Sequence, residues 1–339
     1  MTDNRDRMKE AALNEPVMDN LEESGTTTAL AQGGKDATSQ KTPALKSPEV
    51  DTPPKNLSKM ALYRRRFMRN NTAVAGLIVF VILALFAIFG QYITPWDYQT
   101  PDFLAISQPP SAVHWFGTTG AGNDLFAQVS HGLGRSMIIA VVVSAATMLL
   151  SAFIGAGAAF FGGNVEKVIL AVIHFMLLVP SFLLIALMVS GSGGNWIVLM
   201  VVLTLFGWMY PARVIWSLAI SIREREYVSA ARYMGVSSPR IIARHLVPNI
   251  GSLLIINFTL GIVSTVMSET SLSFLGLGVK LPDVSLGNLL TVGANSIRSA
   301  TWTFWFPAGA LMLLTISVAL ISDGLRDALD PNSSAGGRA

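Results

Sequence analysis

The feature that most constrains this chain is a series of long stretches without charged side chains. Residues 70–96 contain no Asp, Glu, Lys or Arg, and residues 168–212 continue without formal charge over a length too great for one membrane crossing. About 20 apolar residues span a bilayer as a helix. Only 13% of the 339 residues are charged, against about 25% in an average soluble domain. The sequence therefore predicts an all-α integral membrane protein.

Six membrane-spanning helices are predicted from these apolar runs. The small polar residues 191–195 divide the long uncharged stretch into two spans, and Pro180 is expected to kink the first of these two. With their loops, the spans form a predicted membrane domain of residues 61–331. The predicted spans are residues 72–92, 136–161, 169–189, 196–216, 250–268 and 302–321.

Positive charges are distributed unevenly between the two sides of this predicted domain. One side holds most of the Lys and Arg residues, whereas the opposite side has only Arg135, Lys280 and Arg298. Because cytoplasmic segments carry the excess of Lys and Arg, we expect both the N-terminus and the C-terminus to lie in the cytoplasm. The cytoplasmic set is Arg64, Arg65, Arg66, Arg69, Lys167, Arg223, Arg225, Arg232, Arg240, Arg244 and Arg326.

The two ends of the chain differ from the rest in composition. Residues 1–60 mix Ser, Thr, Pro, Gly and charges of both signs without apolar periodicity. Such a segment cannot bury enough apolar surface to offset the entropy lost on ordering. We therefore expect a disordered cytoplasmic tail over residues 1–60 and a short C-terminal tail over residues 332–339. The net charge of +3 is too small to indicate a nucleic-acid partner.

Few residues are candidates for chemistry. The chain has no Cys, and neither a phosphate-binding Gly-x-x-x-x-Gly-Lys sequence nor a cluster of metal ligands is visible. We therefore expect no catalytic residue, no metal site and no cofactor bound by this chain. Apart from Glu269, Arg213 and His174, the spans lack ionisable side chains. An ion-coupled secondary transporter, which places such groups near the midplane of symmetry-related halves, is therefore the less favoured alternative.

The segment between the fourth and fifth spans, residues 223–249, is far more polar than its neighbours and reads as a helical hairpin. Glu224 and Glu226 are expected in the first turn of a helix, where carboxylates are favourable. Gly235 supplies the left-handed residue that ends such a helix. Ser238, followed by proline, has the pattern of the N-cap of a second helix that runs to the end of the segment.

The hairpin also carries a recognisable motif. Ala230 and Ala231, followed after three residues by Gly235 and later by Pro248, resemble the "EAA" loop of the permease subunits of ATP-binding-cassette importers. The general motif has Glu directly before the two alanines, where this chain has Ser229, and Leu before the final Pro, where it has a valine. The nearest acid is Glu226, three residues before Ser229. In this position of the acid the chain resembles the oligopeptide/dipeptide branch of that family.

A second motif lies in the loop before the second span. Residues 114–136 resemble the "H-x-x-G-T-D-x-x-G-R-D" signature of the same family, but Thr119, Asn123 and Gln128 replace one Asp and two Arg residues of that signature. Any salt bridges that those residues make in relatives are therefore in doubt here. A lone histidine in a loop, such as His114, is interpreted as structural rather than as a metal ligand.

Two further motifs follow the fifth span. Residues 269–288 resemble the string "E-x-S-L-S-F-L-G-L-G…P…W-G-N", with Leu286 in place of Trp, and residues 322–331 match the closing "G-D-x-L-R-D-x-L-D-P". Glycines in the first string are expected to let the chain turn or re-enter at membrane depth. For Glu269, placed at the outer end of a span, the simpler interpretation is that it reaches lipid headgroups or a neighbouring donor.

The resemblance covers about residues 61–331 and implies a type I importer permease in the bacterial cytoplasmic membrane. Such a subunit forms half of the translocation pathway for peptides; some relatives instead import nickel, glutathione or antimicrobial peptides. The implied partners are membrane lipid, a second related permease, an extracytoplasmic peptide-binding protein and two ATPase subunits that hold ATP and Mg, with no nucleic acid.

The resemblance and the hairpin geometry together assign two groups of site residues. The residues expected to couple to the ATPase are Glu226, Tyr227, Ala230, Ala231, Arg232, Met234, Gly235 and Pro248. We expect the two alanines to leave a notch beside Tyr227 and Met234. The residues expected at an outer gate or at a contact with the binding protein are Glu269, Phe274, Gly276 and Gly278.

Overall fold

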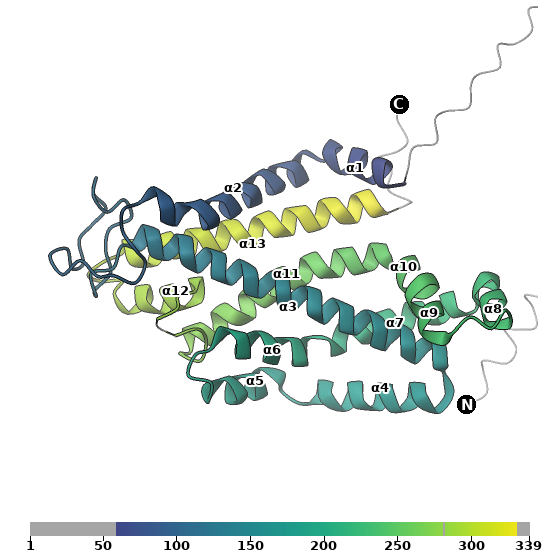
Figure 1. Ribbon diagram of the computed structural model, residues 1–339. Coiled ribbons are helices and arrows are strands. Elements are labelled where there is room, and N and C mark those ends of the chain that lie inside the picture. The colour runs from purple at the N-terminus through teal and green to yellow at the C-terminus, as the bar shows by residue number, and fades with distance from the viewer. Residues whose placement is uncertain (1–58, 281, 331–339) are drawn as a thin grey trace, which may run out of the picture. The chain divides into compact units, whose positions relative to one another are not determined.

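The computed structural model describes residues 59–280 and 282–330, which belong to one compact unit. Its described residues form helices joined by loops, with two isolated β-bridges in the loop between the helices Asn71–Ile93 and Leu125–Phe161, so the predicted all-α fold is confirmed (Figure 1). Residues 1–58 of the tail predicted at 1–60, and the tail predicted at 332–339, lie outside the described residues, whereas residues 59 and 60 belong to a helix rather than to a tail. The elements are α1 (Lys59–Arg69), α2 (Asn71–Ile93), α3 (Leu125–Phe161), α4 (Gly163–Leu178), α5 (Ser181–Ser190), α6 (Trp196–Gly207), α7 (Met209–Arg223), α8 (Glu226–Tyr233), α9 (Ser238–Ile241), a π-helical turn (Ile242–Leu246), α10 (Val247–Asn249), α11 (Gly251–Phe274), α12 (Leu286–Asn295) and α13 (Trp302–Leu329).

Within the described residues, five helices are long and apolar enough to cross a membrane: α2, α3, α6 with α7, α11 and α13. The pair α4 and α5 adds a sixth crossing if it is counted as one span, but it is bent by 77° at its break. Pro180 lies at this break as the N-cap residue of α5, where its missing N–H needs no helical acceptor. The predicted kink is therefore present.

Several helices extend beyond the predicted spans. α3 begins at Leu125 rather than at 136, because the Asp124 side chain accepts a hydrogen bond from Ala127 N and caps the helix inside the loop that follows α2. α11 continues to Phe274 rather than 268, and α13 continues to Leu329 through the closing motif. Apolar runs predict where a helix meets lipid, whereas these ends pack against other parts of the protein.

The helix α3 is the centre of the packing. It contacts α2, α6, α7 and α11, and three hydrophobic clusters in this unit contain residues of α3. Glycines allow the closest approaches. A Cβ at Gly155 would overlap the carbonyl oxygen of Ala212 in α7, and a Cβ at Gly324 in α13 would overlap the Cβ of Ala73 in α2. Small residues commonly line helix interfaces in membranes for this reason.

The short helix α12 was not predicted. It lies between the fifth and sixth spans and packs against α11, α13 and α3. The Ser285 side chain accepts a hydrogen bond from Asn288 N at its start, and a Cβ at Gly293 would overlap the backbone of Thr303. The connection predicted as a turn therefore contains a helix that closes one end of the bundle.

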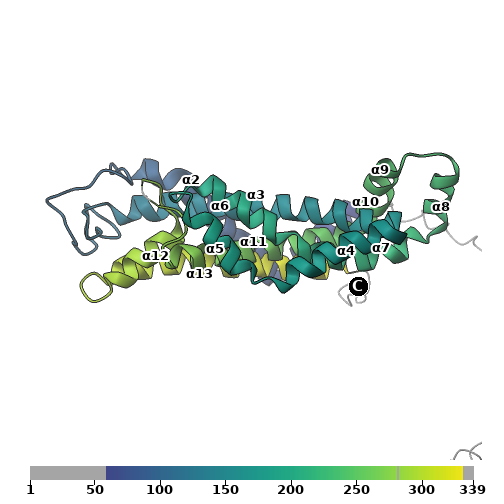
Figure 2. The same ribbon diagram turned by 90° about the horizontal axis from the view of Figure 1, so that it is seen from below.

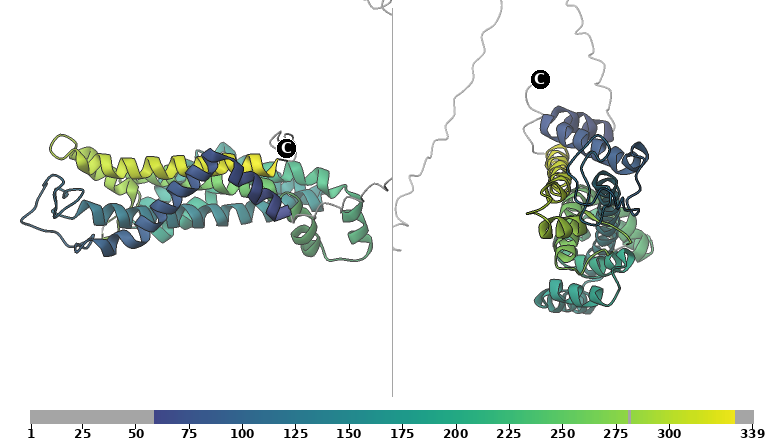
Figure 3. Two further views of the ribbon diagram at one scale, coloured as in Figure 1. Left: turned by 90° about the horizontal axis from the view of Figure 1, so that it is seen from above. Right: turned by 90° about the vertical axis from the view of Figure 1, so that its left-hand side faces the viewer.

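The bundle has different structures at its two ends. Figures 2 and 3 show the hairpin of α8 and α9 at one end, whereas the connection from α2 to α3 and the helix α12 lie at the other. Figure 1 shows α4 and α5 along one edge of the bundle, and among the described helices α4 contacts mainly α3 and α7. The two ends and the space between them are therefore separate candidates for function.

Gly155→Ala tests the central packing. The added Cβ must push α3 and α7 apart at Ala212 O, so we expect the substitution to lower the free energy of unfolding by about 1–3 kcal/mol. Gly157→Ala in the same helix is the matched control, because a Cβ there meets nothing within 4 Å. Thermal unfolding of the purified chain measures both. Equal unfolding temperatures for the two variants would show that this contact does not hold α3 against α7.

Candidate functional site

The predicted helical hairpin is present at residues 223–249. Its first helix, α8, is followed by Gly235, whose φ of +74° lies in the left-handed region. Gly235 N donates a hydrogen bond to Arg232 O, and Val236 N donates to Ala231 O, both at 3.1 Å. These two bonds are those of the Schellman motif that ends many helices.

The rest of the hairpin differs from the prediction in three details. The N-cap of α9 is Ser237 rather than Ser238, and Glu224 is the C-cap of α7 rather than part of the first turn of α8. The second helix is also discontinuous, because a π-helical turn separates α9 from α10. Pro248 has no N–H to donate to a carbonyl one turn earlier, which favours a wider turn before it.

The inner face of the hairpin packs against the end of α3. Arg232 Nη2 donates to the carbonyl oxygen of Phe160 (3.3 Å), and the guanidinium carbon lies 4.7 Å from the centre of the Phe160 ring. The buried side chains of this face belong to a hydrophobic cluster shared with α3, α7 and α11. They are Val228, Ala231, Ile241, Ile242 and Leu246.

The outer face of the hairpin corrects the predicted notch. Ala231 is only 3% exposed and belongs to the inner face, whereas Ala230 is exposed. Successive residues of a helix point about 100° apart, so the two alanines cannot share one surface. The exposed face instead combines Ala230 with Tyr227, Met234 and Tyr233, the last of which is 91% exposed. Sequence reasoning missed Tyr233, although a bulky aromatic residue in a polar loop was a visible signal.

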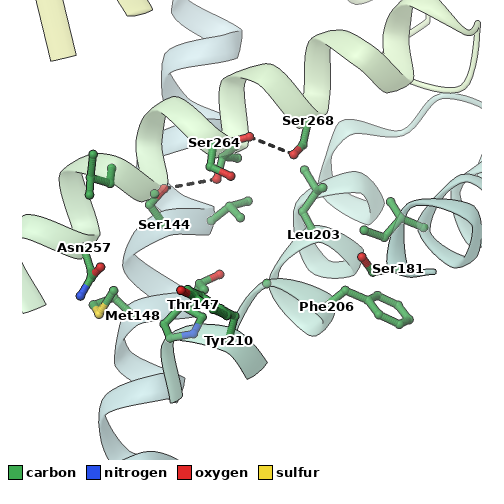
Figure 4. Close-up of a pocket in the computed structure, with 17 residues that line it drawn as sticks. Ser144, Thr147, Met148, Ser181, Leu203, Phe206, Tyr210, Asn257, Ser264 and Ser268 are labelled. Atoms are coloured by element: carbon green, nitrogen blue, oxygen red, sulfur yellow. Dashed lines mark hydrogen bonds between the residues drawn. The ribbon is translucent and has the colours of Figure 1, made fainter. Parts of the chain in front are cut away.

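A polar cavity lies in the middle of the bundle between α3, α5, α6, α7 and α11. Its volume is about 430 Å³, and Figure 4 shows the side chains that line it. Ser144 Oγ lies 3.3 Å from Thr265 Oγ1 and links α3 to α11. Thr147 Oγ1, also in α3, is buried without a hydrogen-bond partner among the described residues. The polar residues of the lining are Ser144, Thr147, Ser181, Tyr210, Asn257, Ser264, Thr265 and Ser268.

The contribution of α11 to this cavity follows a simple sequence pattern. Asn257, Gly261, Ser264 and Ser268 all line the cavity and are spaced by four, three and four residues. This spacing places side chains on one face of a helix. The predicted fifth span therefore held the signal for a polar face, which the search for charged residues did not detect.

The helices α3, α11 and α12 meet at Glu269. This carboxylate is 1% exposed and accepts hydrogen bonds from Ser273 Oγ (2.7 Å), Ser285 Oγ (2.6 Å) and Ser136 Oγ (3.4 Å). Ser136 Oγ in turn accepts from Leu286 N at the start of α12 (3.2 Å). The interpretation that Glu269 reaches headgroups is wrong for this buried side chain, whereas contact with neighbouring donors is confirmed.

The chain turns sharply after α11, as the glycines predict. Gly276 has φ +76°, and a Cβ at Gly278 would overlap Ser273 Oγ. Phe274, which precedes the turn, is half exposed and lines an apolar groove between α11, α12 and α13. The four residues predicted at an outer gate thus lie together, but Glu269 faces the interior and Phe274 faces outward.

An ionic group holds the connection between this turn and α12. Asp283 Oδ2 lies 2.7 Å from Arg135 Nη2, and Asp283 Oδ1 lies 3.0 Å from His131 Nε2, both on α3. The Tyr98 ring stacks on His131 with 3.7 Å between ring centres. The guanidinium of Arg135 also lies 4.2 Å from the ring centre of Trp196 at the start of α6.

His114 has a structural environment in the loop between α2 and α3. It is 2% exposed, and its Nδ1 lies 2.9 Å from Oδ1 of Asp124, the capping residue of α3. The residues that depart from the family signature make neutral hydrogen bonds instead of salt bridges. Asn123 Nδ2 donates to Gln99 O (2.9 Å), and Gln128 Nε2 donates to Tyr98 O (3.2 Å).

Comparison with known proteins identifies relatives over most of the chain. Residues 151–334 match the family described as "Binding-protein-dependent transport system inner membrane component", and residues 58–110 match "N-terminal TM domain of oligopeptide transport permease C". The oligopeptide transport system permease protein OppC of Mycobacterium tuberculosis is 43% identical over 81% of this chain and 96% of its own length. OppC of Escherichia coli K12 is 35% identical over 79% of this chain and 89% of its own length. The dipeptide transport system permease protein DppC of Bacillus subtilis is 32% identical over 79% of this chain and 84% of its own length.

Glu269→Ala tests whether the buried carboxylate joins three helices. Three serine hydroxyls lose their acceptor and a cavity forms, so we expect the free energy of unfolding to fall by about 2–4 kcal/mol. Ser271→Ala in the same helix is the control, because its exposed hydroxyl bonds only the Met267 carbonyl of its own helix. Thermal unfolding is the measurement. If both variants unfold at the same temperature, Glu269 does not stabilise the junction.

Proposed function

Because the chain belongs to the family of binding-protein-dependent transport system inner membrane components, we propose that it is a permease subunit of an ATP-driven peptide importer that forms half of the translocation path. The family makes it a multi-pass inner-membrane transport protein. Peptides are the proposed substrate, because relatives at 32–43% identity are named oligopeptide or dipeptide permeases.

The observation that carries this proposal is the polar cavity in the middle of an apolar bundle. A helix that faces only lipid gains nothing from serine, threonine and asparagine side chains, whereas a path for peptides needs hydrogen-bonding groups. The lining in Figure 4 combines hydroxyls and one amide with apolar side chains such as Leu203 and Phe206, and it contains no charged side chain, which suits substrates of variable sequence. A second related permease would supply the opposite wall.

The energy would come from partner subunits. In this proposal, two ATPase subunits hold ATP and Mg, and this chain contributes no catalytic residue. An extracytoplasmic peptide-binding protein would deliver substrate at the end that contains α12 and the outer loop, and both termini of this chain would lie in the cytoplasm. The excess of Lys and Arg near α1 and the hairpin supports this orientation.

The connectivity of the hairpin suggests how ATP-driven motion reaches the cavity. α7 ends at Arg223 just before α8, and α10 ends at Asn249 just before α11. Both α7 and α11 line the cavity, through Tyr210 and through the stripe that begins at Asn257. Arg223 Nη1 also donates to Ala159 O in α3 (2.8 Å). A displacement of the hairpin by the ATPase would therefore move three walls of the path.

Two substitutions in the hairpin test this coupling. Gly235→Val forces a β-branched residue into the left-handed region at a cost of about 1–2 kcal/mol. Ala230→Trp leaves the inner face untouched but adds a bulky ring to the exposed face. We expect each variant to lower peptide uptake and substrate-stimulated ATP hydrolysis of the assembled transporter by about tenfold or more, as for loss of a central interface contact.

Arg240→Ala, on the exposed surface of α9, is the control and should retain most of the transport rate. Ala231→Trp should behave differently from Ala230→Trp, because its side chain enters the buried cluster and destabilises the chain itself. Normal uptake and normal stimulated hydrolysis in both Gly235→Val and Ala230→Trp would show that the hairpin does not couple the ATPase to the path.

A further inference from the structure

The helix α7 has a polar stripe on its exposed side. Tyr210, Arg213, Ser217 and Ser221 are all exposed and recur at spacings of three, four and four residues, which places them on one face. The opposite face is apolar and buried in the bundle. Its residues are Met209, Ala212, Ile215 and Ala219.

This stripe does not have the composition of a lipid-facing surface. The exposed face of α2 shows such a surface in the same chain, because its outward side chains are Ile78, Ile82, Leu85 and Phe89. A face that carries a guanidinium inside the predicted span 196–216 and two serines in the same helix just beyond it is instead expected beside water or another protein. The stripe also begins at Tyr210, which lines the central cavity.

Arg213 is the one charged group on the part of the stripe that lies inside the span. Ten residues separate it from Arg223, the last residue of α7, so it lies about 15 Å along the helix axis from the end of the helix. Its side chain has no hydrogen-bond or ion-pair partner within residues 59–280 and 282–330. It lines a hollow of about 470 Å³ together with Tyr210, Trp216 and Ser217. Tyr210 thus forms a common wall of this hollow and the central cavity.

We propose that Arg213 binds the carboxylate of the substrate as it passes along the path. An arginine stays charged at any physiological pH and presents a planar fork that fits a carboxylate with two hydrogen bonds. The guanidinium is exposed and has no partner within the described residues, so it is available to an anionic group of the substrate. Every linear peptide carries a carboxylate at its C-terminus. This inference rests on the proposed function, since it assigns a specificity residue to the same path.

The first experiment asks whether the stripe faces water and favours anions. This chain contains no Cys, so Ser217→Cys places the one thiol of this chain one turn from Arg213, and the unsubstituted complete transporter gives the background reaction of its partner subunits. The measured quantity is the ratio of the modification rate by an anionic methanethiosulfonate to the rate by a cationic one. We expect this ratio to be about tenfold higher in Ser217→Cys than in the Ser217→Cys, Arg213→Gln double variant. Ile82→Cys on the apolar face of α2 is the matched control and should react with neither reagent.

Absence of reaction at the Ser217→Cys thiol would overturn the proposal, because it would place the stripe against lipid or a neighbouring subunit. An unchanged ratio of anionic to cationic reaction rates on removal of Arg213 would also overturn it. Either result would leave the proposed permease function standing, since these rates do not depend on peptide uptake.

The second experiment measures uptake of a peptide with a free C-terminus and of its C-terminal amide. We expect Arg213→Gln to lower uptake of the free acid about tenfold, the loss expected for a hydrogen-bonded ion pair, and to leave the smaller uptake of the amide within about twofold of wild type. Arg213→Lys keeps the charge and should restore part of the free-acid rate. Equal losses for both peptides would show a structural role and overturn the proposal, as would unchanged uptake of the free acid. No uptake of either peptide by the wild-type transporter would instead contradict the proposed function.

Discussion

The hydrocarbon core of a bilayer offers no water to backbone N–H and C=O groups, so these groups must bond within the chain. In this protein they do so in long helices, and the constraint determines how a polar path is built. Side chains supply hydrogen-bonding groups to the cavity, through Ser144 and Thr147 of α3 and the polar stripe of α11. The helices α3 and α7, which form two of its walls, approach closely because Gly155 has no side chain at their contact.

Hydropathy predicted the all-α fold and the approximate positions of the crossings, because lipid contact requires long apolar runs. The left-handed turn at Gly235 was also predictable, since glycine adopts this conformation without strain. Helix ends were less predictable. Asp124 starts α3 inside the loop between α2 and α3 through a local cap to Ala127 N. The helix α12 forms where the sequence showed only a turn, because it packs against α3, α11 and α13, which are distant in the chain.

The candidate sites divide in the same way. The hairpin was located from its motif, but the motif could not show that Ala231 faces inward against α3 while Ala230 faces outward. Helical spacing alone allowed either orientation of the face. Glu269 was marked as unusual because it is an acid near the end of a span. The structure shows that it is buried and accepts hydrogen bonds from Ser136 of α3 and from Ser285, the residue before α12.

The helix α11 joins all three candidate regions of the molecule. It begins directly after the hairpin, presents the polar stripe to the cavity in its middle, and carries Glu269 in its last two turns, where Ser285 before α12 bonds to it. Its hydrogen bonds run along its own axis, so a helix of this length transmits displacement more readily than a loop would. A shift that begins at Asn249 would therefore alter the cavity wall and the Ser285 contact of Glu269 together. In the proposed mechanism the two ends of the path need no separate signal, because one helix carries both a wall of the cavity and the Ser285 contact at the end that contains α12.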